Sequence, residues 1–185
     1  MAQPTQPTQA EIFAALSAQA SSSSSRPKPS TSTFESFASS PIEQLTSAST
    51  SSTGKKKVNT RKIYCPREQC SSIILLDGVA ELVEVEGSIL PDESSSPFPA
   101  PSSPHVYWSI PSGPFAFENI GFSRPDTSNP LPPFAPKDVP GEGEGRVKWL
   151  ICAECDLGPL GWSFEGGKGA WLDVKRLRYG EIDPA

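Results

Sequence analysis

Apolar residues recur at about every second position from Thr60 onward, and turn-forming residues separate the runs. A period of two is the pattern of β-strands, whose successive side chains point to opposite faces. The runs predict seven strands, at residues 72–76, 79–85, 106–110, 115–122, 147–152, 161–164 and 170–177. We therefore expect a mainly β fold.

One pair of predicted strands flanks a strong turn signal. Asp77-Gly78 separates residues 72–76 from residues 79–85, and this dipeptide tolerates the positive φ angles of a tight turn. The pattern predicts a β-hairpin at this point.

Two stretches interrupt the alternation, at residues 91–104 and 123–145, and both are rich in Pro, Ser, Gly and acidic residues. We predict that they are long surface loops. The core that remains is modest in size, and a small core gains from a crosslink or a metal site.

Residues 1–58 have the composition of a tail. Ser, Thr, Gln, Ala and Pro dominate there, and aliphatic side chains are few. Such a segment buries too little apolar surface to offset the entropy lost on ordering. We predict a disordered tail at 1–58 and a folded domain at 59–185.

Three short patterns within or beside the tail have two interpretations each. Thr8 with Glu11, and Ser40 with Glu43, resemble helix starts. We favour transient helix there over segments that fold on a partner. The basic run 55–57, followed by Arg61-Lys62, is either a solvated domain boundary, which we favour, or a patch for nuclear import or anionic membranes.

The distribution of charge along the chain indicates which class of partner the protein binds. Residues 59–185 contain 11 Lys and Arg against 18 Asp and Glu, a net charge of −7, whereas residues 1–58 contain 5 against 3, a net charge of +2. Binding to nucleic acid relies on cationic side chains at phosphates, so the acidic domain favours a protein partner.

The first residues lack the apolar core of a signal peptide, and the longest aliphatic run, residues 73–76, is too short to cross a bilayer. We expect a cytoplasmic protein without stable membrane insertion. No heptad repeat is visible, so we expect a monomer.

The chain has four cysteines in two pairs, Cys65 with Cys70 and Cys152 with Cys155. The second pair has the two-residue gap that lets two thiolates reach one ion, and the first has a wider gap of four. Four sulfur ligands fill a tetrahedral zinc ion and leave no position for substrate, so we predict one structural zinc. Disulfides and free buried thiols are the alternatives, but a reducing compartment favours the metal.

Catalytic and nucleotide motifs are scarce. His105 is the only histidine, and no phosphate-binding loop of the Gly-x-x-x-x-Gly-Lys-Ser/Thr type or Gly-x-Gly-x-x-Gly turn occurs. We expect no catalytic role for His105 and no direct nucleotide binding.

Two motifs resemble a known family. Phe-Glu-Asn-Ile-Gly-Phe at residues 117–122 and Cys-Ala-Glu-Cys-Asp-Leu-Gly-Pro-Leu-Gly-Trp at residues 152–162, together with the first cysteine pair, resemble the Mss/Dss family of zinc-binding Rab guanine-nucleotide exchange factors. The similarity covers roughly residues 62–179 outside the two loops. The family's first pair is normally Cys-x-x-Cys, and the Ser-rich tail here is longer than expected.

The resemblance implies a β-tent-like fold that binds secretory-pathway Rab GTPases, preferentially without nucleotide, and promotes GDP release without covalent chemistry of its own. It also implies brief residence at secretory membranes through the Rab partner. A holdase for nucleotide-free Rab is the nearest alternative, and an oxidoreductase similar to methionine sulfoxide reductases is a more distant one.

The resemblance also implies a Rab-binding site, formed by Phe117, Glu118, Asn119, Ile120, Gly121, Phe122 and Glu154. Core packing is an equal alternative for Phe117 and Phe122, because alternate residues of a strand face opposite sides. For Glu118 and Asn119 we favour the interface. For Glu154 a solvated position at the tip of the cysteine turn is an equal alternative.

Overall fold

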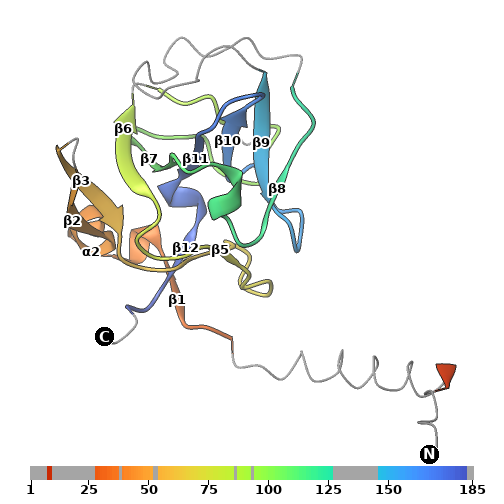
Figure 1. Cartoon of the computed structure of the whole chain (residues 1–185), viewed down its shortest axis with the longest axis horizontal. Coiled ribbons are helices and arrows are strands. Elements are labelled where there is room, and N and C mark those ends of the chain that lie inside the picture. Colours follow the sequence, from red (N-terminus) through yellow and green to blue (C-terminus); the bar gives the residue numbers. More distant parts are fainter. Residues whose placement is uncertain are drawn as a thin grey trace, which may run out of the picture.

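The computed structural model describes residues 8–9, 28–37, 39–51, 54–85, 87–92, 94–126 and 146–182. Strands dominate these residues and form two antiparallel sheets, which confirms the mainly β prediction (Figure 1). The smaller sheet has the order β1 (Thr31–Thr33), β12 (Arg178–Gly180), β4 (Ile63–Tyr64) and β5 (Ile73–Leu75).

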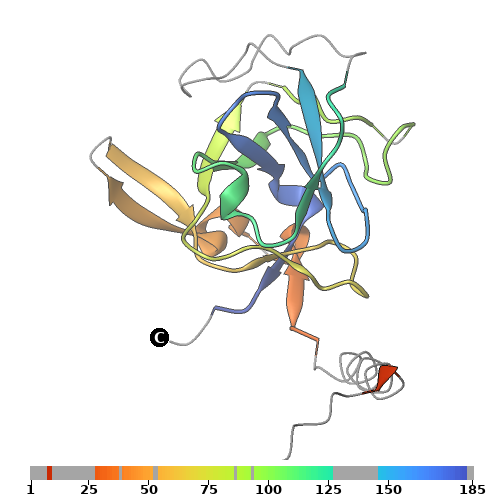
Figure 2. The same cartoon turned by 45° about the vertical axis from the view of Figure 1, so that its right-hand side comes forward.

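The larger sheet contains eight strands. Their order is β2 (Thr46–Ser51), β3 (Gly54–Asn59), β6 (Glu81–Val85), β7 (His105–Ile110), β11 (Ala170–Asp173), β10 (Gly161–Phe164), β9 (Val147–Cys152) and β8 (Ile120–Phe122). Strands β2 and β8 are therefore its two edges, and the β2–β3 hairpin projects away from the body (Figure 2).

Helices are short. The described elements are α2 (Pro41–Leu45) and three single-turn 3₁₀ helices, η1 (Phe34–Ser36), η2 (Pro114–Ala116) and η3 (Val174–Arg176). In the ranges that the structure describes, no helix combines the length and the apolar character needed to cross a bilayer.

The central strands of the large sheet are apolar on both faces. Trp108 of β7 belongs to a core cluster that also contains Ile63 and Tyr179 of the small sheet, so this cluster joins the two sheets. Its neighbour Tyr107 belongs to a second cluster with Trp162 and Trp171, whose rings stack at 5.9 Å. Because successive strand residues face opposite sides, the consecutive residues Val106, Tyr107 and Trp108 of β7 are all buried.

The predicted hairpin at Asp77-Gly78 is wrong. β5 pairs with β4 in the small sheet, whereas β6 pairs with β3 and β7 in the large one. Gly78 does adopt a positive φ of 73°, but its N–H donates to the Asn59 carbonyl. The turn therefore passes the chain from one sheet to the other.

Asn59 explains this crossover, because its buried side chain satisfies backbone groups that a hairpin would have paired. Its Nδ2 donates to the carbonyls of Leu76 at 2.8 Å and Arg61 at 3.0 Å, and its Oδ1 accepts from Ala80 N–H at 2.8 Å. Asn59 is 2% exposed.

We expect Asn59→Ala to destabilise the fold by about 2 kcal/mol, because it leaves buried backbone groups without partners. Equilibrium unfolding in urea measures this loss. A variant as stable as the wild type would show that the crossover does not depend on the Asn59 side chain.

The predicted tail is too long, because strands β1, β2 and β3 and helix α2 all begin before residue 59. β1 pairs with β12, and Leu45 of α2 is 1% exposed within the core. The basic run 55–57 lies in β3, where Lys56 forms an ion pair with Glu81 at 2.8 Å. Sparse apolar residues suffice here because the body of the fold supplies the surface against which they pack. The helix start at Thr8 falls almost entirely outside the described residues.

Two predicted strands are shorter than expected. In the span 115–122 only β8 is a strand, since η2 comes first and Phe117 forms one isolated bridge with Leu75. In the span 170–177, β11 ends at Asp173, whose side chain accepts the Lys175 N–H and begins η3. The described part of 91–104 contains no strand, and most of 123–145 lies outside the described residues.

Candidate functional site

The fold brings the four cysteines together. Their sulfur atoms all lie within 4.8 Å of one another, although the two pairs are far apart in the sequence. The Sγ atoms of Cys65 and Cys155 are 3.5 Å apart, and those of Cys70 and Cys152 are 3.7 Å apart. Ligand bonds of about 2.3 Å in a tetrahedral zinc–thiolate site place sulfur atoms about 3.8 Å apart. The cluster therefore fits a single metal ion.

The second cysteine turn, residues 152–157, is compact. Asp156 N–H donates to the Cys152 carbonyl at 2.9 Å, and Cys152 N–H donates to the Leu157 carbonyl at 2.9 Å. Asp156 has a φ of 56°, which turns the chain back after the second cysteine.

The first cysteine turn, residues 65–72, is longer but reverses the chain direction in the same way. Ser71 N–H donates to the Arg67 carbonyl at 3.2 Å, and Ser71 has a φ of 53°. Arg67 thus takes the place that Cys152 has in the second turn, and Cys65 comes two residues earlier. Cys65 N–H still closes the loop by donating to the Ser72 carbonyl at 2.9 Å. The extra residues lengthen the loop without moving Cys65 out of the cluster.

The pKa values of Cys65, Cys70 and Cys152 are shifted in different directions. Desolvation raises the pKa of both Cys65 and Cys152, the two buried members. Desolvation also acts on Cys70, but hydrogen bonds from Ser72 and from neighbouring thiols lower the pKa of Cys70. A metal ion binds the thiolate forms, so metal binding releases protons and weakens as the pH falls.

The segment 117–122 lies between the two cysteine-bearing parts of the chain. Glu118 N–H donates to the Ile74 carbonyl at 3.1 Å, and Asn119 Nδ2 donates to the Ile73 carbonyl at 2.9 Å, both in β5. On the other side, Ala153 N–H in the second cysteine turn donates to the Asn119 carbonyl at 3.1 Å. A metal that joins the two turns would therefore also fix this segment.

The apolar members of the segment face the core to different extents. Phe117 and Ile120 are half-buried and pack against the main core cluster. Phe122 is 38% exposed and contacts Phe117 edge to face at 6.4 Å. Gly121 lies close to β9, because a Cβ built there would be 3.1 Å from Ile151 Cγ1. Phe122 is thus the apolar residue of the segment that is most available to a partner.

Two acidic side chains lie on the outside of this region. Glu118 and Glu154 are exposed, and neither side chain forms a hydrogen bond or ion pair within the part of the chain that the structure describes. Glu154 lies beside Ala153, so the bond to Asn119 places the two acidic positions on connected segments. Since β8 is an edge strand, no neighbouring strand covers its outer side among the described residues.

Two further residues, one on η2 and one on β9, were missing from the predicted site. Phe115 of η2 is 97% exposed, the highest value among the large apolar side chains that the structure describes as exposed. Lys148 of β9 shares a pocket with Phe122. The sequence analysis placed Phe115 in a predicted strand, although Gly113 and Pro114 directly before it are turn-forming residues and could have signalled its exposure.

A comparison with protein-family models finds a family that matches most of the folded region. The model described as Mss4 protein matches residues 58–179. The matched region is about two thirds of the chain and contains all four cysteines, the segment 117–122 and Glu154. This chain therefore belongs to the Mss4 family.

Proposed function

We propose that this protein binds nucleotide-free Rab GTPases of the secretory pathway and promotes their release of GDP, with one structural zinc ion at the four cysteines. Membership of the Mss4 family supports this at the level of the family, whose members are regulators that interact with Rab GTPases. The observation that carries the proposal is the position of residues 117–122, held between both cysteine-bearing segments at an open sheet edge.

Zinc would act here as a structural ion. Four thiolates complete its tetrahedron, so no position remains for water or substrate. The ion would hold the first cysteine turn, which leads into β5, against the second, which follows β9. Both segments hydrogen bond to Glu118 or Asn119, so the metal would stabilise residues 117–122, which we call the docking strand.

Exchange would require only differential binding. A protein that binds the empty GTPase more tightly than the loaded one must weaken nucleotide binding by the same factor. Each ~1.4 kcal/mol of difference in affinity changes the ratio tenfold. No covalent step by this chain is needed.

The residues of the site divide by exposure. Glu118, Phe122 and Glu154 are the exposed ones, and we assign direct contact with the GTPase to them. Phe117, Asn119, Ile120 and Gly121 are half-buried and support the strand, although the Asn119 amide can still contact a partner. An apolar anchor flanked by carboxylates is suited to a partner surface with apolar and basic groups.

We place this activity in the cytoplasm, with the monomer residing briefly at secretory membranes through Rab. An oxidoreductase of the sulfoxide-reductase kind would need a reactive cysteine outside the metal site. All four cysteines of the chain lie in the cluster.

The release of labelled GDP from a panel of purified secretory Rabs tests the proposal. An exchange factor should accelerate release strongly for at least one Rab, whereas a holdase should bind empty Rab and accelerate release only slightly. If no Rab releases GDP faster and none binds in its empty form, the proposed function is wrong.

For a Rab that responds in this assay, we expect Glu118→Ala to weaken binding of the nucleotide-free form by about tenfold, or ~1.4 kcal/mol, as measured by titration of the empty GTPase. The exposed carboxylate has no partner within the described residues, so the variant should keep its fold. Glu84→Ala is a matched control, because Glu84 is exposed on β6, far from β8 in the sheet order. Equal losses in both variants would argue against a specific role for Glu118.

A further inference from the structure

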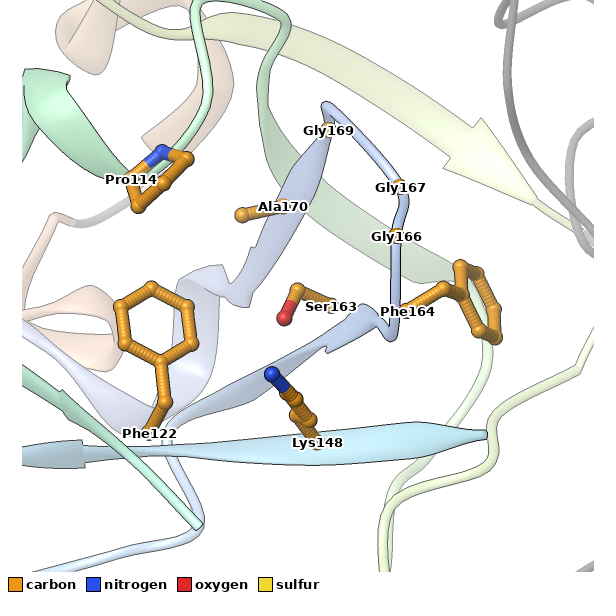
Figure 3. A pocket seen from close by; sticks show the side chains of 9 residues that line it. All are labelled: Pro114, Phe122, Lys148, Ser163, Phe164, Gly166, Gly167, Gly169 and Ala170. Atoms are coloured by element: carbon orange, nitrogen blue, oxygen red, sulfur yellow. The ribbon is translucent and has the colours of Figure 1, made fainter. Parts of the chain in front are cut away.

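A pocket of about 260 Å³ opens beside Phe122, on the face of the large sheet (Figure 3). Phe122, Lys148, Ser163 and Ala170 contribute to it from four adjacent strands, and Pro114 of η2 lies across from them. Small-molecule and cofactor sites are commonly about 300–1,000 Å³. A pocket below that range suits one or two side chains of a partner protein better than a cofactor.

Two donors point into the pocket. Figure 3 shows the Lys148 ammonium and the Ser163 hydroxyl directed toward the same space. Lys148 is half-buried, Ser163 is 6% exposed, and neither side chain has a hydrogen bond or ion pair within the described ranges. The residues that line the pocket include no Asp or Glu. An ammonium with a hydroxyl beside it is suited to a carboxylate, which accepts from both.

The surroundings strengthen such a contact. The rings of Pro114 and Phe122 form an apolar wall on one side of the donors (Figure 3). Excluding water lowers the local dielectric, which makes an ion pair stronger than one on an open surface. Ser163 lies opposite Lys148 in the β9–β10 register, so the two donors are held on adjacent rigid strands.

The negative charge of the whole chain makes the Lys148 pocket an unusual place for an acidic partner group. The protein has a net charge of −5, so its overall charge disfavours the approach of an acidic partner group. Lys148 offers an unpaired positive charge directly beside Phe122, which is an anchor of the proposed docking strand. A partner that covers Phe122 therefore brings its own side chains over this pocket.

We propose that the pocket receives an aspartate or glutamate side chain of the GTPase, with Lys148 as its ion-pair partner and Ser163 as a second donor. This inference rests on the proposed function and names a specificity contact within it. GTPases that present a carboxylate at this position are accepted, and those that present a basic residue there are rejected by the Lys148 charge.

Lys148→Met tests the contact, because it removes the charge and keeps the apolar stem. We expect it to weaken binding of nucleotide-free Rab by about tenfold at low ionic strength, and by less at high ionic strength. Lys57→Met is the matched control, since it makes the same change at an exposed position of β3 and should bind like the wild type. Thermal melting checks that both variants are folded.

A charge exchange identifies the occupant. Acidic residues of the GTPase are changed singly to lysine and tested against the wild type and Lys148→Glu. The proposal requires one lysine variant that binds the wild type poorly and binds Lys148→Glu better. If no such variant exists, or if Lys148→Met binds like the wild type, the inference is wrong while the proposed function stands. If the wild type binds no empty Rab at all, the proposed function itself fails.

Discussion

Replacing Cys152 by serine should release the metal and unfold the domain. Cys152 is a buried member of the cluster and also the last residue of β9, so its loss removes a ligand at the point where the second cysteine turn joins the large sheet. Zinc held by four thiolates contributes on the order of 10 kcal/mol to folding. Small domains have a net stability of about 5–15 kcal/mol, so little of it would remain. Elemental analysis, circular dichroism and limited proteolysis of the purified, reduced protein measure the outcome.

Glu154→Gln provides the control within the same turn. It changes an exposed residue between the two cysteines and leaves every sulfur ligand in place, so it should retain one zinc per chain and its protease resistance. The wild type should lose its fold when a strong chelator removes the ion, and more readily as the pH falls, because protons compete for the thiolates. A Cys152→Ser variant that is folded and free of metal would contradict the structural role of the ion.

Replacing Arg176 by methionine should destabilise the fold by about 3–5 kcal/mol, the usual effect of removing one partner of a buried ion pair. Arg176 is 3% exposed, and its Nε lies 3.7 Å from Asp173 Oδ2. Burial lowers the pKa of Arg176 and raises the pKa of Asp173, which are the expected directions for charges removed from water. Without the guanidinium, the Asp173 carboxylate stays buried and unpaired.

Arg176 also fixes the loop 91–104. Its guanidinium donates to the carbonyls of Pro91 at 3.0 Å, Pro99 at 3.3 Å and Pro159 at 2.9 Å, and it lies 4.9 Å from the centre of the Phe98 ring. The loop and the turn after the second cysteine pair therefore depend on the same side chain. We expect protease cleavage within 91–104 to accelerate in Arg176→Met.

The double variant Arg176→Met with Asp173→Asn separates the two effects. Removing the carboxylate charge should restore part of the lost stability, because no unpaired charge then remains. It should not restore the protease resistance of the loop. Guanidinium unfolding midpoints of the single and double variants measure the first effect. If Arg176→Met alone unfolds like the wild type, the buried ion pair does not stabilise this fold.

The sequence predicted the mainly β fold and most strand positions, because alternating apolar residues and Gly- or Pro-rich turns are local signals. β9 and β10 have the bounds that the pattern indicates. The sequence predicted less well which strands pair with one another. Asp77-Gly78 has the composition of a hairpin turn, yet Asn59, distant in sequence, binds the backbone on both sides of it and directs the chain between sheets.

The candidate site was predictable where the chemistry lies in residue type and spacing. Thiolates at two pairs of positions indicated a metal centre, and the fold brings those four sulfur atoms within 4.8 Å of one another. The segment 117–122 was visible as a motif, but its split into exposed and supporting residues was not. That split depends on β5 and β9, which lie on either side of the segment.

By itself, the sequence determined the class of fold, the two cysteine pairs as a candidate metal centre and the motif at residues 117–122, because each is a pattern of nearby residues. Only the tertiary structure decided that β1, β2 and β3 join the sheets, that Arg176 holds the long loop and that Lys148 faces a pocket beside Phe122. These features arise from contacts between residues far apart in the chain. No local pattern specifies such contacts. They stabilise the fold only when burial of the core has brought the distant segments together.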